Sequence, residues 1–406
     1  MYRKFTADRI FTGRELLPKN KVLLTTDTGL IEDIVDMEEA GDDILDLGGI
    51  LCPGLINCHC HLELSHLKGC IPEKTGLVQF VQEVMSKRYL SASSVPNDLQ
   101  QHQETNQALM EAADNKMFEN GTAAVGDICN TTDSIVVKKN SKLHWHNFIE
   151  LSGFTDAGAA DRMEKAQAIY HEFSSLVRHQ PVTFSPHAPY SVSKKLFTIL
   201  NELTPNQLIT IHNQESAAES DLYISKNGMF LDLYKNLGIN IDSFVPTGQS
   251  SMQSWLPYFN RNQSIISVHN TFTNKDDIDF ANRKVPKDVR QVYYCICINA
   301  NKYIEGAIPP LNLLREKNTN IVLGTDSYAS NWQLNLFEEI RTIQNETANN
   351  IPLPEVLGWA TLNGAQALNM EDKLGSFEKG KQPGVVLIEQ VENMMLTPTS
   401  FVRRIL

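Results

Sequence analysis

The chain is 406 residues long, and its 42% hydrophobic and 21% charged residues are typical of an ordinary soluble globular protein. No apolar run approaches the roughly 20 residues of a membrane-spanning helix, and the first residues lack the apolar core of a signal peptide. We therefore expect a cytoplasmic protein without membrane association. The net charge of −12, with no basic cluster, argues against a nucleic acid polymer as a partner.

The two ends of the chain have the same sequence pattern. Residues 1–51 contain short strand-like stretches separated by Gly and Asp, such as KFTADRIFTG and KVLLTTDTG. The last residues again contain such strand-like stretches, in KLGSFEKGKQPGVVLIEQ and SFVRRIL. We therefore expect residues 1–51 and 371–406 to form one small β-sandwich domain, which leaves residues 52–370 as a continuous central domain.

The central region alternates apolar strand-like runs with helix-like segments. Its predicted strands cover residues 49–59, 122–129, 146–153, 181–187, 208–214, 264–270, 292–299 and 320–327. The helix-like segments include residues 160–180, 193–203 and 334–350. This order predicts an α/β fold, a (β/α)8 TIM-type barrel, with its active site at the carboxyl ends of the strands. A long helical excursion over residues 73–120 follows the first strand, and its apolar stripe predicts either ordinary core or a cover for the pocket.

The first predicted barrel strand ends in the stretch INCHCHLELSH, residues 56–66, where two cysteines alternate with two histidines. Both residue types bind zinc. Because side chains alternate between the faces of a strand, His59 and His61 should share one face, and Cys58 and Cys60 the other. The stretch therefore offers two rival pairs of ligands.

Other predicted strands also end in residues that bind metals or transfer protons. The fourth strand ends in His187, and the fifth ends in His212 with Glu215 three residues later. The sixth strand ends in His269 and the eighth in Asp326. Each feature alone is a weak signal, since a single strand-end histidine is more often a hydrogen-bonded structural residue. Their shared position at strand ends predicts one functional site.

The histidine pair suits this site better than the cysteine pair. Three strand-end histidines and one aspartate offer three nitrogens and one oxygen, a donor set suited to one divalent metal ion with an open position for water. These predicted ligands are His59, His61, His212 and Asp326.

The alternative is a zinc site made of four thiolates. Its ligands would be Cys58, Cys60, Cys295 and Cys297. Two CxC pairs on buried strands do not have the usual spacing of a structural zinc site. The chain has 7 cysteines, and an odd number without an export signal predicts reduced thiols instead of disulfides.

Together these motifs resemble those of the amidohydrolase superfamily, specifically its deaminase and chlorohydrolase branch. PGLINCHCH looks like the first-strand PGxxNxHxH motif, HNQES like the fifth-strand HxxE motif, and LGTDSYASN like the eighth-strand GTDxxxSN motif. PHAPYSVS is similar to the fourth-strand segment of adenosine-type and S-adenosylhomocysteine-type deaminases, and VHNTF fits the sixth-strand histidine. The resemblance covers nearly the whole chain. It departs at Pro383 and Gly384, where Ala-Asp is typical, and at Ile298, which replaces a proline.

The resemblance implies the single-metal subtype, because the fourth strand lacks the lysine that bridges two metals in other members. It also implies hydrolytic deamination of an aminated N-heterocycle, such as an aminopurine nucleoside, by metal-bound hydroxide with release of ammonia. Glu215 would shuttle the proton, His269 would stabilise the transition state, and Asp326 would accept a proton from the water. His187 would contact the substrate. The expected ion is Zn²⁺, with Fe²⁺ or Mn²⁺ as alternatives.

Glu63, in HLELSH, has two interpretations. It is either a solvated carboxylate, as glutamates usually are, or a second substrate-binding residue at the mouth of the barrel. His66, Asn301 and Ser330 are weaker candidates for contacts of this kind.

Two other functions stay open from the sequence. One is hydrolysis of an amide, an amidine or a chloro-heterocycle by the same metal and water. The other is a non-catalytic metal-binding barrel, against which the presence of Glu215, His269 and Asp326 argues. The expected partner is a small-molecule substrate, and related enzymes suggest a homodimer.

Overall fold

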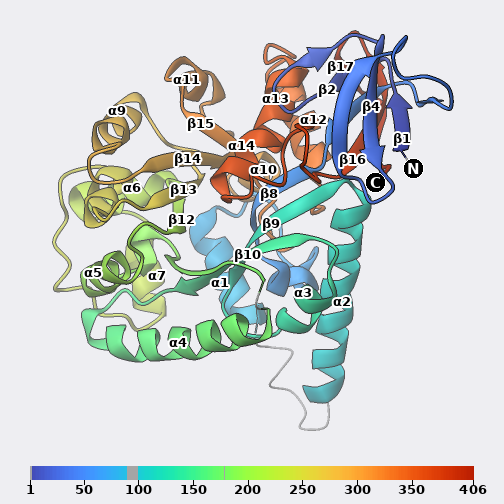
Figure 1. Cartoon of the computed structure of the whole chain (residues 1–406). Helices are drawn as coiled ribbons and strands as arrows, with labels where there is room; N and C mark the ends of the chain where they lie inside the picture. The colour runs from blue at the N-terminus through green and yellow to red at the C-terminus, as the bar shows by residue number, and fades with distance from the viewer. Residues whose placement is uncertain (1, 89–98, 178) are drawn as a thin grey trace.

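The computed structural model describes residues 2–88, 99–177 and 179–406 (Figure 1). Parallel strands at its centre form two four-stranded sheets, with the orders β11-β10-β9-β8 and β12-β13-β14-β15. Most of their residues are buried, because parallel strands in such folds are covered on both faces, and this explains their continuous apolar sequences. The strands are β8 (Leu55–Cys60), β9 (Thr122–Cys129), β10 (His144–Leu151), β11 (Val182–Pro186), β12 (Leu208–Asn213), β13 (Ser264–His269), β14 (Gln291–Ile296) and β15 (Asn320–Leu323).

The two parallel sheets meet along two seams. At the seam between β11 and β12, the backbone N–H of Thr210 donates to Ser185 Oγ at 3.1 Å. Two residues further along β12, the backbone N–H of His212 donates to the carbonyl of His187 at 2.9 Å. This seam therefore places His187 and His212 side by side.

The second seam joins the first strand of the ring, β8, to the last, β15. The backbone N–H groups of Thr325 and Asp326 donate to the carbonyl of His59 at 3.0 and 3.1 Å. Cys60 and Asp326 form a parallel bridge at the same place. The two seams close the ring, and the predicted (β/α)8 barrel is confirmed.

Helices surround the ring of strands (Figure 1). The α-helices are α1 (Leu77–Arg88), α2 (Leu99–Glu119), α3 (Ile135–Asn140), α4 (Ala159–Leu176), α5 (Lys194–Leu203), α6 (Ala217–Ser225), α7 (Phe230–Asn236), α8 (Ser251–Trp255), α9 (Lys275–Lys284), α10 (Ile298–Ile304), α11 (Leu311–Glu316), α12 (Leu336–Glu346), α13 (Leu353–Ala360) and α14 (Leu362–Ala367). Short 3₁₀ helices are η1 (Leu62–Leu67), η3 (Asp156–Gly158), η4 (Pro189–Ser191) and η5 (Leu256–Tyr258). None of the helices in the described parts of the chain combines the length and apolar character that a membrane crossing requires.

The helix α5 shows how the sequence sets these segments. Leu196, Phe197 and Leu200 recur at the spacing of one helical turn and are buried in the core between helices and strands. Ser193 caps the start of the helix, because its hydroxyl oxygen accepts a hydrogen bond from the backbone N–H of Leu196.

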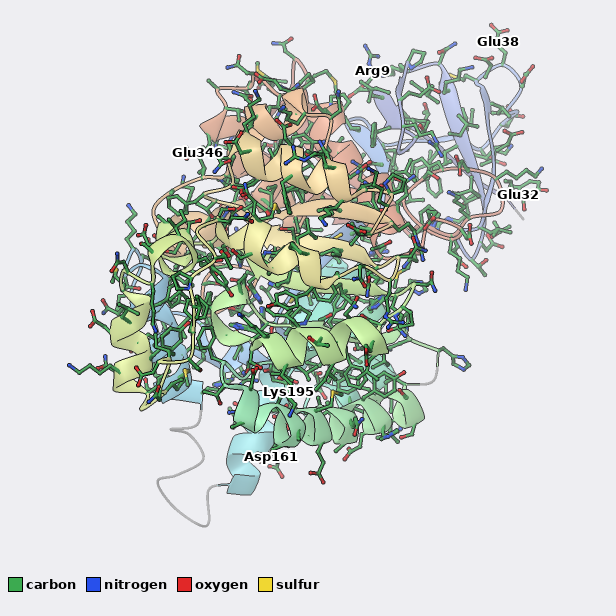
Figure 2. All side chains as sticks on the ribbon, turned by 90° about the vertical axis from the view of Figure 1, so that its left-hand side faces the viewer. Arg9, Glu32, Glu38, Asp161, Lys195 and Glu346 are labelled. Carbon is green, nitrogen blue, oxygen red and sulfur yellow. The ribbon has the colours of Figure 1, made fainter. Side chains whose placement is uncertain are left out.

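The N-terminal residues form a further sheet of the order β5-β4-β1-β6, and both ends of the chain contribute to another, of the order β17-β16-β7-β2-β3. Phe5 and Leu23 of the first sheet share a core with Leu51 and Val385 of the second, so the two sheets pack together. Figure 2 shows Arg9, Glu32 and Glu38 on these sheets, at the end of the molecule away from Asp161 and Lys195. The strands are β1 (Tyr2–Thr6), β2 (Arg9–Phe11), β3 (Leu16–Leu17), β4 (Lys21–Thr26), β5 (Ile31–Asp36), β6 (Leu45–Asp46), β7 (Ile50–Pro53), β16 (Val385–Glu392) and β17 (Met395–Arg404).

The predicted first barrel strand, residues 49–59, is two strands that break at Gly54. β7 pairs antiparallel with β16, whereas β8 pairs with β9. A Cβ atom at Gly54 would lie 2.5 Å from the carbonyl oxygen of Pro383 and 2.6 Å from Ala123 Cβ, so this close approach requires glycine. The division into residues 1–51 with 371–406 and residues 52–370 stays a prediction, and β7 runs across its border.

The predicted strict alternation of Cys58 and Cys60 with the histidines is wrong. The pairing of β8 with β9 is irregular between Asn57 and Cys60. Cys58 packs with Phe148 in a core cluster that draws on β8, β9, β10 and β12 to β15, and so fills the inside of the ring. Cys60 packs with Trp145 in another cluster. The bulge therefore separates the two cysteines and lets both neighbouring histidines reach the same site.

Candidate metal centre and active site

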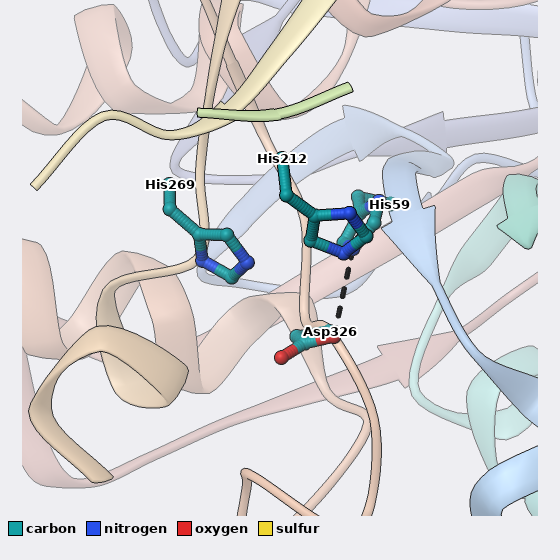
Figure 3. Close-up of side chains that lie close together, drawn as sticks. All are labelled: His59, His212, His269 and Asp326. Carbon is teal, nitrogen blue, oxygen red and sulfur yellow. Dashed lines mark ion pairs between the residues drawn. The ribbon is translucent and has the colours of Figure 1, made fainter. Parts of the chain in front are cut away.

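Three histidines and one aspartate converge at the carboxyl ends of β8, β12 and β15. His61 Nε2 lies 3.1 Å from His59 Nε2 and 3.2 Å from His212 Nε2. Asp326 Oδ1 lies 3.3 Å from His61 Nε2 and 3.5 Å from His59 Nε2. Figure 3 shows His59, His212 and Asp326 pointing toward one another, with His269 beside them. The structure thus brings together the four residues predicted as ligands.

The spacing of these atoms fits a metal ion. In a zinc site with bonds of about 2.0–2.1 Å, neighbouring ligand atoms lie roughly 2.8–3.6 Å apart, and four such protein ligands leave room for a water as a fifth. Burial lowers the pKa of His61 and His212 well below the ordinary histidine value, which keeps both rings neutral. Neutral imidazole nitrogens are the form that binds metals. The cluster therefore suits a divalent metal ion.

Contacts behind the cluster orient the two donors that come from β12 and β15. His212 Nδ1–H donates to the carbonyl of His187 at 2.8 Å, so that Nε2 presents its lone pair to the cluster. Asp326 Oδ2 accepts a hydrogen bond from Ser330 Oγ at 2.6 Å. Asp326 has a positive φ of 57°, a conformation that a non-glycine residue adopts at a cost and that is common at functional sites.

A buried ion pair fixes the backbone next to His61. Asp127 Oδ1 accepts a hydrogen bond at 2.8 Å from the backbone N–H of Leu62, the residue after His61. Asp127 Oδ2 lies 2.5 Å from Lys138 Nζ, and neither side chain has measurable solvent exposure. The aromatic ring of Trp145 lies 5.0 Å from the same ammonium group. The position of the η1 helix, and with it His61, therefore depends on this pair.

His269, also a predicted site residue, lies beside the cluster. Its Nδ1–H donates to Asn301 Oδ1 at 2.8 Å, and its buried Nε2 has no hydrogen-bond partner among the described residues. Burial lowers the pKa of His269 to about 4, so its Nε2 is an acceptor at neutral pH. Ligand atoms of His269, His59, His212 and Asp326 all lie within 4.8 Å of one another.

Glu215 stands next to His269, with Oε1 3.5 Å from His269 Nε2. Burial raises the pKa of Glu215 well above the ordinary value, and the negative charges of Asp326 and Glu219 add to this effect. The carboxyl group therefore retains a proton under conditions in which an ordinary glutamate has lost it. Its backbone is fixed, because the N–H groups of Gln214 and Glu215 donate to the Glu219 carboxylate at 2.9 and 2.8 Å.

His187 and Glu63, both predicted to bind substrate, have different surroundings. His187 lines the cavity described below, and its Nδ1 lies 2.5 Å from Ser191 Oγ. Glu63 is buried, and its Oε2 accepts a hydrogen bond from Arg88 at 2.9 Å. Backbone N–H groups of residues 130 and 131 donate to the same carboxylate at 3.1 and 3.0 Å. Arg88 lines the cavity, whereas the Glu63 carboxylate faces these protein donors; a direct substrate contact by Glu63 stays a prediction.

A cavity of about 640 Å³ opens above the cluster, within the size range of small-molecule sites. Polar groups form its base: His61, His187, His212, Glu215, His269 and Asp326. Apolar side chains form much of its wall: Leu64, Leu77, Phe80, Val84, Leu233 and Tyr234. Helix α1 thus contributes to the wall, as one interpretation of the excursion over residues 73–120 predicted; residues 89–98 of that excursion lie outside the described residues.

Sequence reasoning missed several residues that line this cavity. Glu150, at the end of β10, and the cations Arg88, Arg162 and Lys165 are among them. Glu150 had a detectable signal, since it is an ionisable residue at the carboxyl end of a predicted strand. The cations had none, because they lie on helices where exposed Lys and Arg are common.

The thiolate alternative finds no support. Cys58 and Cys60 lie in different clusters, and burial raises the pKa of both thiols well above the ordinary value. The groups of potential ligands found within residues 2–88, 99–177 and 179–406 contain histidine, aspartate and glutamate but no cysteine.

An eight-stranded parallel barrel with a buried His/Asp cluster at the carboxyl ends of its strands defines a barrel of the metal-dependent hydrolase type. Residues 50–403 match the Amidohydrolase family, and the chain belongs to this family. This confirms the family that the motifs indicated and the prediction of a metal-dependent enzyme of the amidohydrolase type.

Individual relatives are deaminases. The chain is 27% identical over 362 residues to the 5'-deoxyadenosine deaminase of Methanococcus vannielii, covering 86% of this chain and 76% of the relative. It is 28% identical over 356 residues to the 5-methylthioadenosine/S-adenosylhomocysteine deaminase of Thermoanaerobacter pseudethanolicus, covering 84% and 73%. The solved aminofutalosine deaminase of Helicobacter pylori, in complex with methylthio-coformycin, has the same fold, with a TM-score of 0.79 at 21% identity over 97% of this chain and 93% of that chain.

Proposed function

We propose that the chain is a metal-dependent deaminase that hydrolyses the exocyclic amine of an aminated purine nucleoside and releases ammonia. The observation that carries this proposal is Glu215, a buried acid whose pKa is raised, next to His269 and the His/Asp cluster. The names of the relatives, which are deaminases of adenosine derivatives, support the same reaction.

The proposed metal ligands are His59, His61, His212 and Asp326, and the proposed ion is Zn²⁺. Three neutral nitrogens and one carboxylate oxygen suit zinc, although Fe²⁺ and Mn²⁺ occupy similar donor sets. When bound, a divalent ion activates water for attack at neutral pH.

The residues of the chain handle the protons. Glu215, whose raised pKa favours the protonated carboxyl group, donates its proton to the ring nitrogen next to the carbon under attack. Asp326 accepts a proton from the attacking water. The hydroxyl group of Ser330 positions this carboxylate by donating a hydrogen bond to its Oδ2 atom. Glu215, now deprotonated, takes up the second proton of the attacking oxygen as the carbonyl forms and delivers it to the departing amine, which leaves as ammonia. The proton held by Asp326 then restores the acid form of Glu215. His269 orients the attacking oxygen through its unprotonated Nε2.

The cavity supports a substrate with an apolar portion in addition to its heterocycle. Its volume of about 640 Å³ exceeds what a single purine base fills, and side chains of α1 and α7 make its wall apolar. His187 is the proposed contact to the heterocycle, because it lines the cavity next to His212, with ring centres 4.9 Å apart.

An ammonia-release assay tests this function. Purified protein with its metal content measured is incubated with adenosine, 5'-deoxyadenosine, 5'-methylthioadenosine, guanine and a chlorinated triazine. The expected result is ammonia from at least one nucleoside, and loss of turnover after dialysis against a chelator with recovery on addition of Zn²⁺. Glu215→Gln should retain the metal and lose about 10²–10⁴-fold in kcat. Chloride release from the triazine without nucleoside turnover would instead favour the chloro-heterocycle hydrolase.

The cytoplasmic location and the homodimer stay predictions. Light scattering at several protein concentrations tests the second of these.

A further inference from the structure

Glu150 is a half-buried acid of the cavity that the proposed reaction does not use. Its side chain is 6% exposed, and it lines the cavity at the end of β10. Its buried Oε1 atom has no hydrogen-bond donor among the described residues. A buried carboxylate oxygen without a donor is costly, so this position calls for a donor that the ligand supplies.

The nearby histidine does not satisfy this carboxylate. His212 Nδ1 lies 3.9 Å from Glu150 Oε1, beyond hydrogen-bond distance. The same N–H already donates to the carbonyl of His187 at 2.8 Å. His187 Nδ1 is likewise engaged, with Ser191 Oγ at 2.5 Å.

A second metal ion does not fit this place. Ligand atoms of Glu150, His187 and His212 lie within 4.8 Å of one another. However, His212 Nδ1 carries the proton that it donates to a carbonyl, and His212 Nε2 faces the first cluster, 3.2 Å from His61 Nε2. His212 therefore has no nitrogen left for another ion.

The position of Glu150 relative to the reacting end identifies the kind of donor. His212 turns Nε2 toward the metal cluster and Nδ1 toward Glu150, so the carboxylate lies on the far edge of that ring. The departing amine must lie near the cluster and Glu215, and the Glu150 carboxylate is therefore left for a different donor of the substrate. In a purine nucleoside the other donors are the hydroxyl groups of the sugar. Two neighbouring hydroxyls match the two oxygens of one carboxylate, and hydrogen bonds to a charged acceptor are among the stronger ones.

We propose that Glu150 binds the 2'- and 3'-hydroxyl groups of the substrate's ribose and selects ribonucleosides over deoxyribonucleosides. This inference rests on the proposed nucleoside deaminase function and specifies how the same site recognises its substrate. Glu150 takes no part in the chemical step, so its effect falls on recognition of the sugar.

The test compares paired substrates on the metal-loaded enzyme. The probes are adenosine and 2'-deoxyadenosine, or the corresponding pair of whichever nucleoside the wild type deaminates. One hydrogen bond to a charged group contributes about 1.5–3 kcal/mol, so the wild type should favour the ribonucleoside about 10–150-fold in kcat/KM. Glu150→Gln should lower kcat/KM for the ribonucleoside, which loses both hydroxyl contacts, by at least this factor, and should lower that for the 2'-deoxynucleoside, which has only the 3'-hydroxyl to lose, by a clearly smaller factor. Glu164→Gln, an exposed acid on α4, is the matched control and should behave as wild type.

Calorimetric binding of inosine and 2'-deoxyinosine, which lack the reacting amine, gives a readout independent of turnover. Inosine should bind more tightly to the wild type, and Glu150→Gln should abolish the difference. Equal losses on both members of a pair, or a wild type indifferent to the 2'-hydroxyl, would overturn the role of Glu150 while leaving the deaminase intact. If the wild type deaminates no nucleoside, the proposed function fails and this inference fails with it. Even if the variant does not fold, the wild-type comparison can still overturn the proposal, because a protein without preference for the 2'-hydroxyl cannot select ribonucleosides through Glu150.

Discussion

Lys138 and Asp127 form an ion pair that lies wholly inside the protein, behind the η1 helix that carries His61 into the site. Burial lowers the pKa of Lys138, but the attraction of Asp127 outweighs it, so the pKa is raised and the ammonium group stays charged. Replacement of Lys138 by methionine keeps most of the side-chain volume and removes the charge. Asp127 then remains buried without its counter-ion.

The cost of this change follows from the way a buried carboxylate loses its charge. It must bind a proton, and for an aspartic acid with an ordinary pKa of about 3.9 this costs about 4 kcal/mol at pH 7. The same figure falls within the range of about 3–5 kcal/mol for removing one partner of a buried pair. We therefore expect Lys138→Met to lower the free energy of unfolding by about 4 kcal/mol at pH 7.

The loss should depend on pH in a defined direction. In the variant, the folded state holds one more proton than the unfolded state between pH 4 and 7, so stability falls as pH rises through this window. The destabilisation relative to wild type should therefore shrink by about 1.4 kcal/mol for each unit of acidification, to about 1.5 kcal/mol at pH 5.

Urea unfolding followed by circular dichroism at pH 5, 6 and 7 measures this effect. Lys139→Met, at the exposed neighbouring lysine, is the control and should stay within about 0.5 kcal/mol of wild type. Adding Asp127→Asn to Lys138→Met should restore most of the stability at pH 7, because the unpaired charge is gone. A loss independent of pH, or a double variant no better than the single one, would refute the reasoning.

Three further substitutions follow from the contacts around the site. Ser330→Ala removes the hydroxyl that donates to Asp326 Oδ2, and metal affinity measured by chelator competition should fall about 10–100-fold; unchanged affinity would contradict this role. Asn301→Leu removes the acceptor for His269 Nδ1–H, so kcat should fall about 10–100-fold at constant metal content, whereas full activity would show that His269 needs no such partner. Gly54→Ala introduces a Cβ at 2.5 Å from a backbone oxygen and should cost about 1–3 kcal/mol in thermal unfolding; an unchanged midpoint would mean that the backbone yields freely.

The barrel was predictable because its strands carry their own signal. Strands covered on both faces are continuous apolar runs, and a polar residue such as His212 or Asp326 marks where each run reaches the mouth. The break at Gly54 and the bulge before Cys60 were not predictable, because both depend on pairing with strands distant in the sequence. The hydrophobic pattern of a segment indicates which of its residues are buried, whereas the register of a strand depends on the strand with which it pairs.

The convergence of the histidines and Asp326 was also predictable, since strand ends of a barrel meet at one rim. The surroundings of Glu63 were not, because its partner Arg88 lies 25 residues further along the chain. Glu150 was overlooked although its position at the end of a predicted strand was visible in the sequence. A single glutamate at a strand end looks the same in sequence whether its carboxylate faces solvent or a buried cavity, and only the packing distinguishes the two.

The seam between β8 and β15 has a consequence for biosynthesis. His59 and His61 emerge early from the ribosome, but the backbone groups that pair with His59, and the carboxylate that completes the proposed centre, come only after β15, the last strand of the ring. Chains fold in the order in which they are made, so a nascent chain lacks the complete centre until the last barrel strand has left the exit tunnel. Loading with the ion therefore follows the emergence of β15, and a chain that terminates before β15 carries the histidine ligands without the carboxylate that completes the proposed centre.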